Sequence, residues 1–204
     1  MLLANAAISA LLNLLVLAGL PFLCYFAYQK WRHNRGFGEI AQRAGLQLGE
    51  GRHIGYSLAF AVAGVAAFVI WSPPLGPLVR EGSASRQFVG LGLGWPALPM
   101  ALLYGVVKTG FTEELLFRGL IAGSLSRRLS VLWANLGQAL VFLVPHLLLL
   151  LIMPEMWGLL PLLFAGSLVF GWVRIRSGSI IGSWLMHASA NVAMALSVAI
   201  RTAT

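Results

Sequence analysis

Two adjacent carboxylates and an arginine lie within six positions of a long apolar segment. They are Glu113, Glu114 and Arg118, and the chain has six acidic residues in all, every one of them Glu. A charge at the depth of a bilayer costs about 2.5 kcal/mol or more, so ionisable groups in such a segment predict a functional site. Glu114 and Arg118 are four residues apart, so they face the same way on a helix and can pair. Glu113 points about 100° away and is free to face a cavity.

Two histidines and an asparagine lie in later apolar segments. His187 and Asn191 are four residues apart and present two polar tips on one helix face. His146 follows Pro145, which cannot donate its backbone hydrogen bond and tends to kink a helix. Counted from the predicted cytoplasmic ends of their segments, Glu113, His146 and His187 lie roughly 15 to 24 Å deep. We therefore expect these side chains to converge near the middle of the membrane.

Three chemistries compete for this set of residues. In the first, Glu113 is the general base for a water that His146 also holds, and His187 and Asn191 donate hydrogen bonds to the developing oxyanion. In the second, Glu113, His146 and His187 bind Zn²⁺, whose water is the nucleophile. In the third, the carboxylates and histidines form a proton or ion relay of a transporter.

Each group also has a purely structural interpretation. Glu114 and Arg118 can be an ion pair with no chemical role, and His146 can be a hydrogen-bonded core histidine. His187 and Asn191 can simply join helices. Other protease types fit poorly, because the chain has no Asp for an aspartyl dyad and no H-E-x-x-H zinc signature.

Composition indicates an integral membrane protein. The chain has 204 residues, of which 59% are hydrophobic and only 10% are charged, against about 25% charged residues in ordinary soluble domains. The net charge of +8 comes from basic residues between apolar segments, which is typical of loops that flank membrane spans rather than of nucleic-acid binding. Cys24 is the single cysteine, so no disulfide can form within the chain.

The apolar segments predict an all-α, polytopic membrane bundle of about six spans. The basic loops at 29–52, 127–128 and 174–176 all fall on one side under this count, which would be the cytoplasmic side, with both termini on the outer side. An interfacial helix is expected near 37–48, and an interfacial or re-entrant piece near 88–95. The predicted spans are 3–28, 54–71, 97–126, 131–153, 157–173 and 179–200.

The third of these spans is longer than the roughly 20 residues that a crossing needs, so it must tilt or break near Gly110. We expect one membrane domain over 1–204. Its N-terminal spans and cytoplasmic loop occupy 1–96, and its catalytic core occupies 97–200.

Three motifs, in this order on separate spans, resemble those of the CPBP family of CaaX-protease and bacteriocin-processing (Abi) membrane proteins. This family includes the type II CaaX prenyl endopeptidases, and the resemblance covers roughly residues 97 to 200. The motifs are Glu113-Glu114-x-x-x-Arg118, Phe142-x-x-x-His146 and His187-x-x-x-Asn191.

The resemblance implies a glutamate-dependent intramembrane endopeptidase without a cofactor, Zn²⁺ being the alternative. Glu113 and His146 would hold the catalytic water, His187 and Asn191 would line the oxyanion site, and the remaining motif residues would support them. The substrate would be a membrane-anchored peptide or protein, met in the lipid bilayer, with no nucleic acid involved.

The chain is short for a eukaryotic prenyl protease, which favours a bacterial member in the inner (cytoplasmic) membrane. We expect it to process a C-terminal anchor or a peptide of an exported protein. The alternatives are a CaaX-type prenyl-protein endopeptidase and a non-catalytic immunity or scaffold protein. A transporter would predict inverted repeats, and the sequence shows none.

Overall fold

The computed structural model describes residues 1–71, 74–151 and 154–203. These residues form helices joined by short turns, with no strand among them. The predicted all-α membrane bundle is therefore confirmed. Helices suit a bilayer, because their backbone polar groups form hydrogen bonds within the helix. The outward surfaces of the long helices are rich in exposed Leu, Val and Trp.

The long helices match the six predicted spans. Five are long and apolar enough to cross a membrane on their own, and the sixth, residues 97–126, contains the charged motif. Residues 152 and 153, at the end of the predicted fourth span, lie outside the described residues. The five apolar helices are Leu2–His33, Gly51–Trp71, Val131–Leu148, Met156–Ser177 and Ile181–Arg201.

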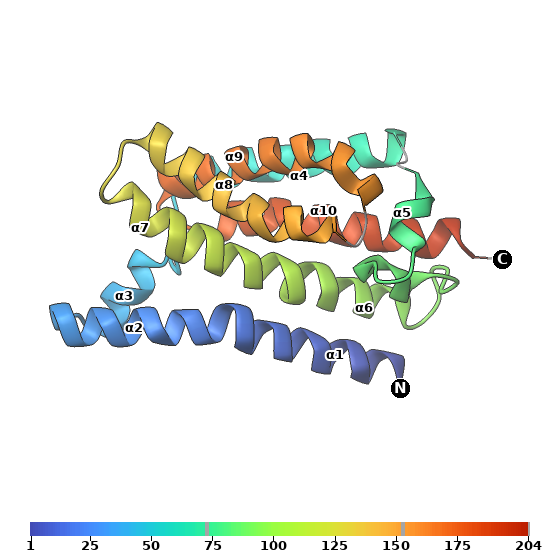
Figure 1. The fold of residues 1–204 in the computed structure, drawn as a ribbon, viewed down its shortest axis with the longest axis horizontal. Helices are drawn as coiled ribbons and strands as arrows, with labels where there is room; N and C mark the ends of the chain where they lie inside the picture. Colours follow the sequence, from blue (N-terminus) through green and yellow to red (C-terminus); the bar gives the residue numbers. More distant parts are fainter. Residues whose placement is uncertain (72–73, 152–153, 204) are drawn as a thin grey trace.

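Figure 1 labels these helices along the chain. The first span is one continuous helix made of α1 (Leu2–Asn13), a π-helical stretch (Leu14–Gly19) and α2 (Leu20–His33). The other four apolar helices are α4 (Gly51–Trp71), α8 (Val131–Leu149), α9 (Leu160–Ser177) and α10 (Ile181–Arg201).

Both termini lie at the same end of the bundle (Figure 1), as an even number of crossings requires. The basic loops meet at the opposite end, because Arg127 Nη1 and Arg174 Nη2 donate to the carbonyl oxygen of Arg43 at 3.2 and 3.0 Å. Arg43 is the last residue of α3 (Phe37–Arg43), the expected interfacial helix. The gathering of the basic loops is thus confirmed, and the side of the membrane that they face remains a prediction.

The remaining short elements lie between the spans. The region expected to be interfacial or re-entrant, 88–95, consists of turns after a short helix, and the side chain of Phe88 is fully buried against Tyr104. The short elements are α5 (Leu75–Val79) and two 3₁₀ turns, Ala84–Phe88 and Pro154–Leu159.

The third span is a continuous helix that widens instead of breaking at Gly110. Its π-helical turns carry backbone hydrogen bonds five residues apart, and such turns are frequent at functional sites. Glu113 lies at the junction of two π segments. The span consists of α6 (Ala97–Leu102), a first π segment (Leu103–Phe111), a second π segment (Glu114–Ala122) and α7 (Gly123–Ser126).

Helix α10 packs against α4 on one side and against the first π segment on the other. Gly105 and Gly110 both face α10, where a Cβ on Gly105 would lie 2.6 Å from Val192 Cγ2 and one on Gly110 would lie 3.3 Å from Ala188 Cβ. Residues five apart share a face in a π turn, whereas in an α-helix they diverge. The widened helix therefore brings both glycines against α10.

We predict that Gly105→Val destabilises the protein by about 1–3 kcal/mol, because the new side chain overlaps the backbone of α10 at Val192. The measurement is the thermal unfolding midpoint of the purified protein in detergent. Gly64→Val is the matched control, because a Cβ on Gly64 of α4 meets nothing within 4 Å. Equal midpoints for the two variants would contradict the close packing.

Candidate functional site

A buried ion pair lies at the centre of the bundle. Arg118 Nη1 is 3.1 Å from Glu114 Oε1, and both side chains are fully buried. Arg118 also donates from Nη2 to Ser167 Oγ at 3.0 Å. Its guanidinium lies over the rings of Phe142 and Phe170, 4.5 and 5.3 Å from their centroids. The predicted pairing of Glu114 with Arg118 is therefore present, and Phe142, the first residue of the second motif, packs on it.

His187 of α10 lies between the two carboxylates. Its Nδ1 is 2.9 Å from Glu114 Oε1, and its Nε2 is 3.8 Å from Glu113 Oε2. An ionised carboxylate only accepts hydrogen bonds, so Nδ1 carries the hydrogen in the short contact and Nε2 faces Glu113. Glu113 keeps 25% of its side chain exposed. A separation of 3.8 Å is too long for a direct hydrogen bond and suits a bridging water.

Asn191 lies one turn further along the same face of α10. Its Nδ2 donates to Thr109 Oγ1 at 2.8 Å, and Thr109 in turn donates to the carbonyl oxygen of Tyr104 at 2.9 Å. Trp184 Nε1, on the other side of His187, donates to the carbonyl oxygen of Val106 at 2.8 Å. These bonds fix α10 against the first π segment.

His146 approaches the site from α8. Its Nδ1 is 2.8 Å from the carbonyl oxygen of Phe142, and the two rings pack with their centroids 4.6 Å apart. Because a carbonyl oxygen only accepts, Nδ1 carries the hydrogen, and Nε2 of the neutral ring is left as an acceptor. In the described part of the chain His146 forms no ion pair with Glu113. It is joined to the centre through Phe142 and Arg118.

A polar network holds the helices behind the ion pair. Gln138 of α8 donates to the carbonyl oxygen of Ser167 at 2.9 Å, and Asn135 donates to that of Leu168 at the same distance. Hydrogen bonds of this kind join helices where no water competes. Through Ser167, the network continues to Arg118.

The sequence analysis missed Thr109, Gln138 and Lys108. Each is a polar or charged side chain inside a span, and that signal alone could have flagged them. The partner of Thr109 could not have been predicted, because its pairing with Asn191 depends on the π-helical phase of the third span.

The expected zinc ligands Glu113, His146 and His187 are not gathered into one cluster. Within residues 1–71, 74–151 and 154–203, no three His, Cys, Asp or Glu side chains are arranged to hold a metal ion. His187 is engaged with both carboxylates, and His146 is turned toward its own helix. Zinc binding at this site remains a prediction.

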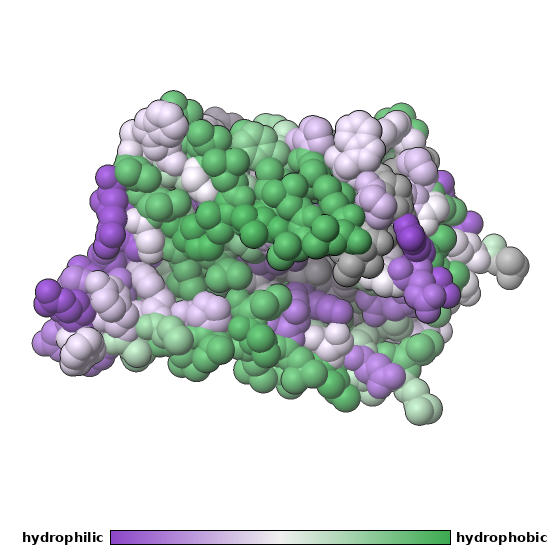
Figure 2. All heavy atoms as spheres, in the orientation of Figure 1, coloured by the Kyte–Doolittle hydropathy of each residue, from purple (hydrophilic) through white to green (hydrophobic). Residues whose placement is uncertain are grey.

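Figure 2 shows the hydropathy of one face of the bundle. Hydrophilic atoms gather in a band between the apolar surface of α1 and that of α8, over the third span. The fold and the site therefore define a membrane protein with a polar, carboxylate- and histidine-containing centre inside a helical bundle.

Comparison with protein families assigns this centre to a known group. The family model described as "Type II CAAX prenyl endopeptidase Rce1-like" matches residues 94–193, which include all three motifs. This match supports the CPBP family for the chain and an intramembrane endopeptidase of the CAAX/CPBP type in general. No curated protein and no solved structure matches the chain.

We predict that Glu114→Ala destabilises the protein by about 3–5 kcal/mol, because it leaves the charge of Arg118 buried without a partner. The double variant Glu114→Leu/Arg118→Met should recover most of this loss, since it removes both buried charges together. Thermal unfolding of the two purified variants makes the comparison.

An exposed carboxylate supplies the control. Glu39 pairs with Arg35 at 2.6 Å but keeps 49% of its side chain exposed, so Glu39→Ala should cost less than about 1 kcal/mol. A double variant as unstable as Glu114→Ala would show that the loss does not come from the unpaired arginine.

Proposed function

We propose that the chain is a glutamate-dependent intramembrane endopeptidase in which Glu113 activates the attacking water. One observation carries the proposal: His187 is anchored to the buried Glu114 by Nδ1 and presents Nε2 toward the partly exposed Glu113. One carboxylate orients the histidine, and a second carboxylate faces its other nitrogen. This arrangement resembles that of the activated groups in hydrolytic sites.

The proposed oxyanion role requires a hydrogen on both nitrogens of His187. Glu113, Glu114 and Arg118 together carry one net negative charge in an apolar bundle. A proton on His187 neutralises the site, and buried charges are tolerated only where they are compensated. The protonated ring donates from Nδ1 to Glu114 and from Nε2 toward the gap beside Glu113.

The reaction then follows from the positions of these groups. Glu113 takes a proton from a water, and the water oxygen attacks the carbonyl carbon of the scissile peptide bond. The carbonyl oxygen becomes negative and accepts hydrogen bonds from His187 Nε2–H and from the amide of Asn191. The carbon–nitrogen bond breaks, and Glu113 passes its proton to the leaving nitrogen.

His146 contributes a second acceptor for the water. Its Nδ1–H donates to the carbonyl oxygen of Phe142, which fixes the tautomer with a free lone pair on Nε2. Pro145 precedes it in α8 and leaves a helix carbonyl without its usual donor. Substrate binding would bring Nε2 of His146 to the water that Glu113 holds, since catalytic hydrogen bonds often tighten only in the substrate complex.

The substrate that we propose is a membrane-associated protein from which a C-terminal anchor or peptide is removed. A second candidate is a CaaX-type prenyl protein, because the matching family model bears that description. An apolar groove of about 300 Å³ beside the site favours this second candidate. Its lining includes Leu46, Phe111, Ile181 and Trp184, and Phe111 lies two residues before Glu113.

We predict that Glu113→Gln abolishes cleavage and leaves the unfolding midpoint unchanged, because Glu113 is partly exposed and makes no short contact. The measurement is a comparison of membrane proteins from cells that carry the wild-type chain or the variant. New C-terminal truncations should appear only with the wild type. His146→Ala should give the same loss.

Farnesylated and unmodified forms of one peptide, offered to the purified enzyme, then separate the two substrate candidates. Identical sets of protein termini in the two strains, at equal abundance of the chain, would rule out the endopeptidase and favour the scaffold or immunity function.

We predict that Asn191→Ala lowers kcat by about 10²-fold with little change in KM, which is the usual effect of removing an oxyanion donor. Thr109→Val, which removes only the partner of the Asn191 amide, should lower kcat less, and Thr109→Ser should restore it. The assay is hydrolysis of the substrate that the comparison of termini identifies. A kcat that Asn191→Ala leaves unchanged would exclude this residue from the oxyanion site.

A further inference from the structure

A second charge lies inside the third span, outside the motifs. Lys108 is one of two lysines in the chain and is half-buried. It follows Ala97, the first residue of the span, by eleven positions, which is roughly 16 Å along a helix. Its ammonium group forms no hydrogen bond or ion pair with any residue that the structure describes. An unpaired cation at this depth is costly and indicates a partner that is not part of the chain.

Lys108 lies in a groove between the third span and α1. The groove has a volume of about 620 Å³, and its walls include the apolar side chains of Ile8, Leu12 and Val16. It is continuous with the surface rather than closed, and it lies along the face of the first span that packs on the π segment. A ligand with an apolar body can therefore enter it from the bilayer.

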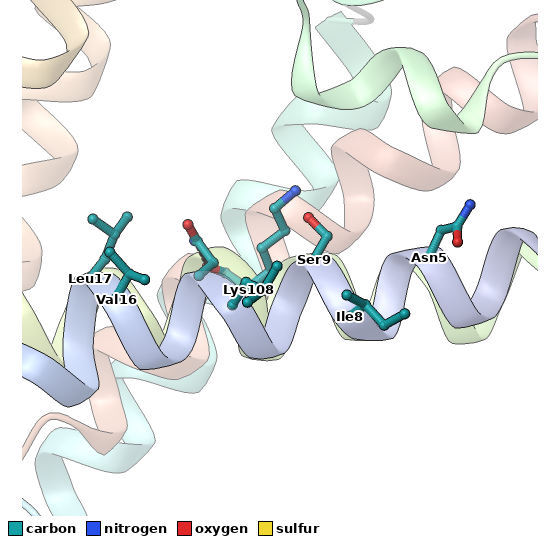
Figure 3. Close-up of a pocket in the computed structure, with 8 residues that line it drawn as sticks. Asn5, Ile8, Ser9, Val16, Leu17 and Lys108 are labelled. Atoms are coloured by element: carbon teal, nitrogen blue, oxygen red, sulfur yellow. Dashed lines mark hydrogen bonds between the residues drawn. The ribbon is translucent and has the colours of Figure 1, made fainter.

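Three polar side chains of α1 line the same groove. Asn5, Ser9 and Asn13 recur every four residues, so they form one stripe along the helix. In Figure 3 the polar ends of Asn5, Ser9 and Lys108 lie on the same side of α1. Asn13 Nδ2 donates to the carbonyl oxygen of Lys108 at 2.6 Å, which fixes the two helices beside the lysine. One cation and several hydrogen-bond donors in an apolar groove suit a carboxylate on an apolar chain.

The groove is close to Glu113, the proposed catalytic base, along the third span. Glu113 is five residues after Lys108, and the intervening turn is π-helical as far as Phe111, which brings the two side chains closer to one side of the span than a regular α-helix would. The offset along the axis is about 7 Å, which two or three residues of extended peptide cover. A chain bound in this groove would therefore present a peptide bond to Glu113.

We propose that Lys108, with the polar stripe of α1, binds a carboxylate of the substrate within a few residues of the scissile bond. This inference rests on the proposed endopeptidase function and specifies which substrates the site accepts. The carboxylate belongs either to the free C-terminus of the chain or to an acidic side chain near it. Lys108 is thus a specificity-determining residue, and Glu113 and His187 carry the chemistry.

The test measures binding in a Glu113→Gln background, in which no peptide is cleaved. The probes are fluorophore-labelled peptides of Leu and Ala that end in a free carboxylate, in a carboxamide, or in a carboxamide preceded by Glu. A carboxylate form should bind about tenfold or more tightly than the plain carboxamide, as expected for an ionic hydrogen bond. The form that binds more tightly, with either the free C-terminal carboxylate or the Glu side chain, identifies which carboxylate Lys108 binds.

Three further variants assign the effect to the lysine. Lys108→Met should bring the carboxylate peptide down to the affinity of the carboxamide, and Lys108→Arg should keep most of the difference. Lys30→Met removes the other lysine, at the end of α2, and should leave the affinities unchanged. Lys108→Met removes a charge from a span, so its unfolding midpoint should not fall.

The proposal is overturned if all the peptides bind the Glu113→Gln protein with equal affinity, or if Lys108→Met still prefers the carboxylate peptides. It is also overturned if phosphatidylglycerol vesicles displace the peptide and this displacement depends on Lys108. The last result would assign the groove to a lipid. Because binding is measured without cleavage, a carboxylate preference that depends on Lys108 would stand even if no cleaved protein depended on Glu113.

Discussion

The buried pair of Glu114 and Arg118 is the interaction on which the site depends. Two opposite charges that are removed from water are stable only when both are paired and hydrogen-bonded. Arg118 is paired with Glu114, donates to Ser167 and lies against two aromatic rings, and Glu114 also contacts His187. Nε and Nη1 of Arg118 and Oε2 of Glu114 have no hydrogen-bond partner among the described residues, so the pair meets this requirement only in part. The pair joins the third span to α8, α9 and α10, and it holds one nitrogen of His187 so that the other faces Glu113.

Glu114 and Arg118 consequently have a structural task that differs from the proposed catalysis. Glu114 is inaccessible to a substrate, because its side chain is fully buried. Its carboxylate holds Nδ1 of His187 and so sets the orientation of that ring. In the proposed mechanism, the carboxylate that positions His187 is separate from the carboxylate that reacts, although the two are adjacent in the chain.

Much of this arrangement could be predicted from residue types and spacing. The six spans follow from apolar segments, and the gathering of the basic loops follows from the distribution of Lys and Arg. The pairing of Glu114 with Arg118 follows from their spacing. The contact of His187 with both carboxylates could not be predicted, because it depends on the π-helical phase of residues 103–122. For the same reason the pairing of Thr109 with Asn191 could not be predicted from their spacing. The two glycines at 105 and 110 would fall on different faces of an α-helix.

The widened third span also limits how this part of the chain can change length over evolution. Each residue added to or removed from a helix turns everything beyond it by about 100°. A single deletion between Gly105 and Glu113 would turn the carboxylates away from α10, while the glycine contacts on the other side of the deletion stayed in place. Substitutions in this stretch can be absorbed one at a time, but insertions and deletions cannot. Homologous chains should therefore vary in sequence between the glycines and the glutamates while conserving the number of residues.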